Sequence, residues 1–267
     1  MISVFFLSLS LAPSFADNGF NFWGSREVFA LEPVTDGLFL SGGVLLSGGD
    51  LILDNVLKVN RQEYDGRTYD KKDVNGFDRK FMQSYSKKLD TAGDLLLVAT
   101  MATPAVLAAT EKEEWLTCGM MYAETLLIAN GIKEVTKLAV NRTRPFMYYD
   151  PSTYPEEDVE EGDWANSFPS GHSTMAFTSA AFTSYTFCKY FPDSKFKIPV
   201  VAGSYAMAFG GAALRISSGN HFMTDVMTGA ALGTAVGFLV PYLHTLNANS
   251  SLNVSLLSNG IMIAVKY

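Results

Sequence analysis

Six long apolar stretches restrict what this chain can fold into. They run over residues 37–53, 95–109, 115–132, 173–190, 198–214 and 222–243. Each is about 15 to 22 residues long, close to the ~20 that a helix needs to cross the hydrocarbon core of a bilayer. We therefore predict an all-α fold, a bundle of about six long apolar helices that spans a membrane, with any functional site at one end of the bundle.

The composition is consistent with this prediction. Charged residues make up 18% of the chain, against about 25% in an ordinary soluble domain. Small residues such as Gly229 and Gly233 are frequent in the last three stretches and would let helices approach closely in lipid. A water-soluble helical bundle stays open, because Asp50, Glu124 and Asp225 lie within the stretches. The net charge of -7 predicts no nucleic-acid partner, since such binding needs a basic surface.

Four regions are expected along the chain. Residues 1–16 resemble a signal peptide, because a short apolar run ends in Ser14-Phe15-Ala16, although no Lys or Arg precedes it; a retained anchor stays open. Residues 17–90 hold the first apolar helix and a polar loop with a short amphipathic helix around 78–88. Residues 91–245 form the core. Residues 246–267 form a polar tail, a linker followed by a strand-like end over 260–266.

Three short motifs lie at the ends of these stretches. Their members are cations, imidazoles, a carboxylate and the residues of one helix start: Lys137, Arg144, Ser170, Gly171, His172, Arg215, His221 and Asp225. In an alternating array of helical hairpins, the ends that carry the motifs lie on the same side. We therefore expect all three motifs to meet at one mouth of the bundle.

The third motif combines an imidazole, a carboxylate and a guanidinium. His221 and Asp225 are four residues apart, so on a helix they share a face. A carboxylate bonded to one imidazole nitrogen fixes the tautomer and leaves the other nitrogen free to attack. Arg215 brings a fork of donors that suits phosphate oxygens. A His and an Asp at this spacing also occur for structural reasons alone.

The other two motifs supply donors and positive charge. Ser170 and Gly171 stand where a loop becomes a helix, and helix N-terminal amides bind anions; a capped helix start is the structural alternative. His172 would sit in the first turn, placed to donate a proton. Lys137 and Arg144 flank the end of the third stretch, where basic residues also occur simply as boundary residues. We leave out Arg142, whose spacing does not match, and expect His244 to be incidental.

Taken together, Lys-x6-Arg-Pro, Pro-Ser-Gly-His and Arg-x5-His-x3-Asp resemble the three signature motifs of the phosphatidic acid phosphatase type 2 superfamily. This superfamily includes membrane lipid phosphatases, soluble bacterial acid phosphatases and vanadium haloperoxidases. The resemblance covers roughly residues 90–245. One departure is Leu214 before Arg215, where the family usually has Ser; it removes a polar neighbour of the phosphate site but no charge and no nucleophile.

The resemblance implies a role for each motif residue. The phosphoryl oxygens would be held by Lys137, Arg144, Ser170, Gly171 and Arg215. His221 would attack phosphorus, Asp225 would orient it, and His172 would protonate the departing alcohol. Cations around the transferred group neutralise charge in the transition state, so we expect neither a metal nor a cofactor in catalysis.

The expected function is a metal-independent phosphatase that removes phosphate from a lipid phosphomonoester or diphosphate through a phosphohistidine. Its partners would be the phosphorylated lipid and the bilayer. The alternatives are a soluble periplasmic acid phosphatase, a vanadate haloperoxidase and a non-catalytic phospholipid binder. An acidic loop over residues 150–163 is expected to overhang the mouth and to repel highly charged soluble anions.

The expected location is a bacterial-type inner membrane, but two arguments disagree about the side of the site. The loop over residues 54–90 carries nine Lys and Arg, which by the positive-inside rule favours a cytoplasmic site. The family resemblance favours an external, periplasmic site, and we follow it.

Overall fold

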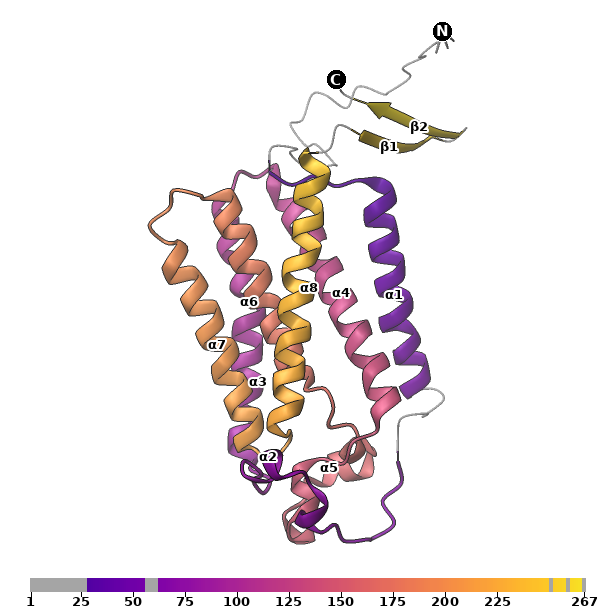
Figure 1. The fold of residues 1–267 in the computed structure, drawn as a ribbon, viewed down its shortest axis with the longest axis vertical. Coiled ribbons are helices and arrows are strands. Elements are labelled where there is room, and N and C mark those ends of the chain that lie inside the picture. Colours follow the sequence, from indigo (N-terminus) through magenta and orange to yellow (C-terminus); the bar gives the residue numbers. More distant parts are fainter. Residues whose placement is uncertain (1–27, 56–61, 250–251, 258–259, 266–267) are drawn as a thin grey trace.

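In the part of the chain that the structure describes, six long helices pack into a bundle (Figure 1). The structure is a computed structural model. It describes residues 28–55, 62–249, 252–257 and 260–265. The signal-peptide-like segment 1–16 lies outside the described residues. The long helices are α1 (Pro33–Asn55), α3 (Lys87–Met101), α4 (Glu114–Val140), α6 (Gly171–Tyr190), α7 (Lys197–Ser217) and α8 (Met223–Asn249). The predicted all-α bundle is confirmed.

The long helices follow the predicted apolar stretches, and α3 and α4 extend beyond them with polar turns. Helix α3 begins at Lys87 rather than at residue 95, and the 3-10 helix η2 (Thr103–Ala109), with Pro104 near its start, continues it. Helix α4 runs on to Val140. These polar extensions carry charged side chains to one end of the bundle.

Helices α6 and α8 pack with their backbones almost in contact. A Cβ atom added to Gly233 of α8 would lie 2.2 Å from the carbonyl oxygen of Thr174, and one added to Gly237 would lie 2.3 Å from that of Thr178. No side chain fits at these positions. The close packing holds the start of α6 against the start of α8.

Replacing Gly233 by Ala should therefore destabilise the protein by about 2–3 kcal/mol, because the new methyl group would push the two helices apart. In an open helix interior the same change is stabilising by about 0.5–1 kcal/mol. Gly203 of α7 has nothing within 4 Å of an added Cβ, so Gly203→Ala is the matched control. Unfolding in detergent measures both variants. Equal stability of the two would contradict this packing.

Short elements cover the end of the bundle where α4 and α7 end and α3, α6 and α8 begin (Figure 1). They are η1 (Lys71–Asp73), α2 (Gly76–Arg79), η3 (Pro145–Tyr148), η4 (Pro151–Thr153), α5 (Glu156–Glu160) and η5 (Asp163–Ala165). Buried Phe146 and Trp164 form their core. The indole N–H of Trp164 donates to the carbonyl of Gln62 at 2.8 Å. The predicted acidic loop is thus a folded part of this cap.

The predicted amphipathic helix over residues 78–88 is wrong. Helix α2 ends at Arg79, and α3 starts only at Lys87. The backbone between them is held by the turn that joins α7 to α8: the N–H of Ser86 donates to the carbonyl of Ser218 at 3.0 Å. Gly219 has a φ of 77°, and an added Cβ would lie 2.7 Å from the Ser84 carbonyl. These tertiary contacts outweigh the local helical pattern.

The C-terminal region ends in a β-hairpin at the opposite end of the bundle (Figure 1). Strand β1 (Leu252–Leu257) pairs antiparallel with β2 (Gly260–Val265). Strand β2 coincides with the predicted strand-like end. Residues 252–257, expected to be linker, instead form a strand, and the alternation of Leu252, Val254 and Leu256 with polar or small residues was the missed signal.

Within the described residues, three helical segments are long and apolar enough to cross a membrane: Lys87–Ala109, Lys197–Ser217 and Met223–Leu246. Helices α4 and α6 fall outside this group. Helix α4 carries charges such as Glu124 and Lys133, and α6 is rich in Ser and Thr. Large apolar side chains nevertheless face outward, with Ile198 80% and Leu95 69% exposed.

Candidate active site

A cavity of about 390 Å³ opens at the capped end of the bundle. Six of the eight residues singled out in the sequence line it: Lys137, Arg144, Gly171, His172, Arg215 and His221. They come from the end of α4, the segment that follows it, the start of α6, the end of α7 and the turn into α8. The other two, Ser170 and Asp225, are fully buried and are not among the lining residues.

His221 lies in the turn between α7 and α8 and is only 3% exposed. Its Nδ1 lies 2.7 Å from the carbonyl oxygen of Ser167 and 3.8 Å from Oδ2 of Asp225. A carbonyl oxygen can only accept, so Nδ1 carries a proton and donates it. In the neutral ring Nε2 is then the unprotonated nitrogen, which is the nucleophilic form.

The surroundings keep this ring neutral. Burial, together with the guanidinium groups of Arg144 and Arg215, lowers the pKa of His221 well below its usual range. Desolvation and nearby positive charge both disfavour the imidazolium form. A buried histidine that is neutral at pH 7 has the electron pair that nucleophilic attack requires.

Asp225 acts on His221 through the loop rather than by direct contact. Its Oδ2 accepts hydrogen bonds from the hydroxyl of Ser167 and from the N–H of Phe222, the latter at 2.8 Å. These bonds fix Ser167, whose carbonyl oxygen accepts from His221, and Phe222, which follows His221 in the chain. The sequence predicted a carboxylate that orients His221; the structure inserts Ser167 between the two.

Arg142, whose spacing matches none of the three motifs, ties this arrangement to the cap. Its guanidinium donates to Asp225, to Asp78 Oδ2 at 2.7 Å and to the hydroxyl of Thr224 at 2.8 Å. It also stacks on Phe222, with 4.1 Å from Cζ to the ring centroid. Both carboxylates are fully buried, so Arg142 is their charge partner and supports the turn that carries His221.

The two arginines of the cavity are paired with carboxylates that the motifs did not include. Arg215 contacts Asp90, and Asp94 at 3.5 Å, both from α3. Arg144 contacts Asp163, and Asp158 at 3.9 Å, both from the acidic loop. The acidic loop therefore lines the cavity, as expected. Phosphate oxygens bound here would have to share the guanidiniums with these carboxylates.

Asn220 links the two arginines. Its side-chain oxygen accepts from Arg144 at 3.0 Å, and its amide group donates to Asp90 at 2.9 Å. In the described part of the chain, the buried Nε of Arg215 has no hydrogen-bond partner. An unused N–H donor on a buried guanidinium is the kind of group that an anionic ligand satisfies.

A second lysine joins Lys137 in the cavity. Lys133 stands one helical turn earlier on α4 and also lines the cavity, and Glu134 contacts both lysines, Lys137 at 3.7 Å. A Cβ on Gly171 would lie 3.3 Å from Cδ of Lys133. The missing side chain at position 171 thus leaves room for the lysine stem over the start of α6.

His172 lies in the first turn of α6, with Nε2 2.7 Å from Oδ1 of Asp94. Asp94 is more than half exposed. Ser170 caps α6: its hydroxyl oxygen accepts from the N–H of Ser173 at 3.4 Å. The predicted contact of Ser170 with phosphate is less direct than that of the lining residues, since Ser170 lies behind the cavity wall.

Four cations, four carboxylates and two imidazoles line this one polar cavity at the end of a helical bundle. Residues 119–248 match the family model of the PAP2 superfamily, which confirms the resemblance that the motifs carry. A similar solved structure is that of the first transmembrane PAP2 type phosphatidylglycerolphosphate phosphatase from Bacillus subtilis. The two chains are 20% identical, with a TM-score of 0.45, over 79% of this chain and 95% of that one. No curated protein matches the chain.

Proposed function

We propose that this protein is a membrane-embedded, metal-independent phosphatase that hydrolyses a lipid phosphomonoester or diphosphate through a phosphohistidine on His221. The observation that carries the proposal is the shared cavity. His221, held neutral, lines it together with His172 and the cations Lys137, Arg144 and Arg215. The match to the PAP2 superfamily supports the same chemistry.

In the first step, Nε2 of His221 attacks phosphorus and the P–O bond to the lipid breaks. Burial and the nearby Arg215 lower the pKa of His172 to about 4 in the empty site. The negative charge of the bound phosphate opposes this, so His172 takes up a proton when the substrate binds and the imidazolium gives it to the departing oxygen. An alcohol (or a lipid monophosphate, from a diphosphate) leaves. Lys137, Arg144 and Arg215 neutralise the charge on the three equatorial oxygens as it develops. The result is a phosphoryl group bonded to His221.

In the second step, water replaces lipid. His172, now a neutral imidazole, takes a proton from a water molecule. The oxygen of that water attacks phosphorus. The N–P bond breaks, its electron pair returns to Nε2 of His221, and inorganic phosphate leaves. Asp94, 2.7 Å from His172 Nε2, is placed to hold the ring between the two proton transfers.

The bundle suits a substrate delivered from lipid. Outward-facing apolar side chains cover helices that are long enough to span a bilayer, and the cavity lies at their ends, at the depth of lipid headgroups. The test is phosphate release by the expressed protein from phosphatidic acid and from an isoprenyl diphosphate. Activity that sediments with membranes and needs detergent for extraction supports the proposal. Activity in the aqueous extract would instead favour a soluble acid phosphatase.

Neutralising the acidic side of the cavity should broaden substrate choice. In the double variant Asp158→Asn/Asp163→Asn, two negative charges beside Arg144 are lost, so kcat/KM for pyrophosphate should rise roughly tenfold relative to a lipid phosphomonoester. Glu156→Gln/Glu157→Gln is the matched control, because both residues are exposed on the same loop. The same ratio in both variants would refute a filtering role.

We place the cavity on the periplasmic side of an inner membrane. A cysteine introduced at Asp150, in the loop after Pro145, should react in intact cells with a thiol reagent that does not cross membranes. Labelling only after the cells are broken would place the site in the cytoplasm.

A further inference from the structure

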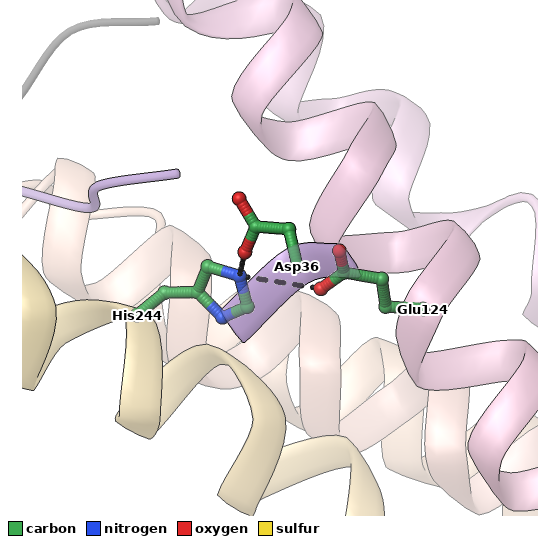
Figure 2. Close-up of side chains that lie close together, drawn as sticks. All are labelled: Asp36, Glu124 and His244. Atoms are coloured by element: carbon green, nitrogen blue, oxygen red, sulfur yellow. Dashed lines mark hydrogen bonds and ion pairs between the residues drawn. The ribbon is translucent and has the colours of Figure 1, made fainter. Parts of the chain in front are cut away.

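A second cluster of ionisable side chains lies inside the bundle, away from the cavity (Figure 2). Asp36 of α1, Glu124 of α4 and His244 of α8 point toward one another. Nε2 of His244 lies 3.0 Å from Oδ1 of Asp36 and 3.2 Å from Oε2 of Glu124. All three side chains are more than nine-tenths buried, and each offers one ligand atom within 4.8 Å of the others.

The hydrogen bond at the far side of the ring fixes its tautomer. Nδ1 of His244 lies 2.9 Å from the carbonyl oxygen of Val240. Because that oxygen can only accept, the proton sits on Nδ1. A neutral ring therefore presents the unprotonated Nε2 to two carboxylate oxygens, and three electron pairs would face one another. A proton on the ring or on one carboxyl group, or a metal ion between the three groups, removes this repulsion.

Charge balance and the unpaired carboxyl oxygens together favour a metal ion. A protonated ring contributes +1 against -2 from two carboxylates and leaves a buried net charge of -1, which is costly away from water. In addition, Asp36 Oδ2 and Glu124 Oε1 have no hydrogen-bond partner among the described residues. A divalent cation with a neutral ring gives a net charge of zero.

We propose that Asp36, Glu124 and His244 bind one divalent transition-metal ion of the Zn²⁺ or Mn²⁺ kind. One imidazole nitrogen with two carboxylates is a donor set that such ions accept, whereas Ca²⁺ and Mg²⁺ prefer oxygen alone. The bond from Nδ1 to Val240 is the second contact that metal-binding histidines usually make. Asp36 also lines a cavity of about 290 Å³ with Leu31, Leu116 and Met120, which provides a path for entry.

The ion serves the fold rather than the phosphatase reaction. His244 follows Asp225 on α8 by 19 positions, which is roughly 28 Å along a helix at 1.5 Å per residue. The cluster therefore lies near the opposite end of α8 from His221. It joins α1, which precedes the region matched to the PAP2 superfamily, to α4 and α8. A bound ion would fasten α1 onto the rest of the bundle.

The test is metal content and thermal unfolding of the full-length protein in detergent. The protein is stripped with a chelator, given Zn²⁺ or Mn²⁺, freed of excess ion and analysed by mass spectrometry of the metal. We expect about one ion per chain and a midpoint of unfolding raised by roughly 5 °C. Glu124→Gln and His244→Ala should lose both effects. The matched control is Glu114→Gln, a buried carboxylate on the same helix that accepts from Tyr190 at 2.6 Å.

Two results would overturn the proposal. One is less than about 0.2 ion per chain in the wild-type protein with no change in its unfolding. The other is metal binding by Glu124→Gln equal to that of Glu114→Gln. Either would assign the cluster to an imidazolium held between two carboxylates. Should His244→Ala fail to fold, the isosteric Glu124→Gln variant and the titration of the stripped wild-type protein still decide the question.

Discussion

Replacing His221 by Ala should lower kcat/KM for a lipid phosphate by about 10³-fold or more, while the protein stays folded. The substitution removes the nitrogen that attacks phosphorus, and loss of the nucleophile removes the covalent route altogether. Phosphate release measures the effect, and thermal unfolding in detergent checks the fold. Because the ring is buried and neutral, its loss should change stability far less than activity.

A residual activity near that of the wild type would contradict the assignment of His221. His172→Ala gives a useful contrast, since it removes the proton donor and leaves the nucleophile. It should slow a lipid with a poor leaving group by about 10²-fold or more, and a nitrophenyl phosphate, whose leaving group needs no proton, much less. Equal slowing of both substrates would assign His172 another role.

Replacing Arg142 by Ala should destabilise the protein by about 3–5 kcal/mol, because it leaves two buried carboxylates, Asp78 and Asp225, without their charge partner. Urea or thermal unfolding in detergent measures the loss. The matched control is Arg67→Ala: Arg67 pairs with Asp65 at 3.0 Å, but both side chains are more than half exposed. Water screens such a surface pair, so Arg67→Ala should leave the stability nearly unchanged.

The effect of Arg142→Ala should depend on pH. Burial would raise the pKa of Asp78, but hydrogen bonds from Arg142, Asn75 and Thr224 outweigh it and lower the pKa below its usual value. In the wild type this carboxyl therefore stays charged down to about pH 4. In the variant Asp78 keeps its burial without the guanidinium, so its pKa rises and protonation relieves the buried charge as the pH falls. The difference between variant and wild type should therefore shrink between pH 7 and about pH 4. A difference that stays constant over this range would contradict the ion-pair explanation.

The sequence predicted the helices and the motif residues of the site better than the contacts between them. The apolar stretches located six helices, and the spacing of the motifs placed Lys137, His172 and His221 at ends that do meet. Asp90 and Asp94 were missed because the polar first turns of α3 look like a loop in the sequence. Lys133 was missed because Lys137 alone matched the motif, although their four-residue spacing places both on one face of a helix.

Other residues were missed for a different reason: ion pairs between positions far apart in the chain leave no local pattern in the sequence. Arg142 and Asp78 are 64 positions apart, and Arg215 and Asp90 are 125 apart. His244 looked incidental for the same reason: its partners Asp36 and Glu124 come from two distant helices. In the sequence Glu124 is an isolated charge within an apolar stretch, and Asp36 and His244 each lie one residue outside such a stretch. Only the packing of α1, α4 and α8 brings them together.

The pairing of Arg144 and Arg215 with carboxylates bears on how the site selects its substrate. Four acidic side chains line the cavity beside four cations, so the site is close to neutral before substrate enters. A phosphate group must compete with Asp90, Asp158 and Asp163 for the guanidinium donors. A lipid gains additional binding energy from its acyl chains in the bilayer, which a soluble anion lacks.

In the proposed mechanism, His221 carries the phosphoryl group during turnover. The most direct measurement mixes the enzyme briefly with a ³²P-labelled lipid phosphate and stops the reaction with base. Proteolysis and mass spectrometry then identify the labelled peptide. We expect a phosphoryl group on His221 that is stable in base and released in acid, and no label in His221→Ala. Label on another residue, or turnover at the normal rate with no label on His221, would contradict it.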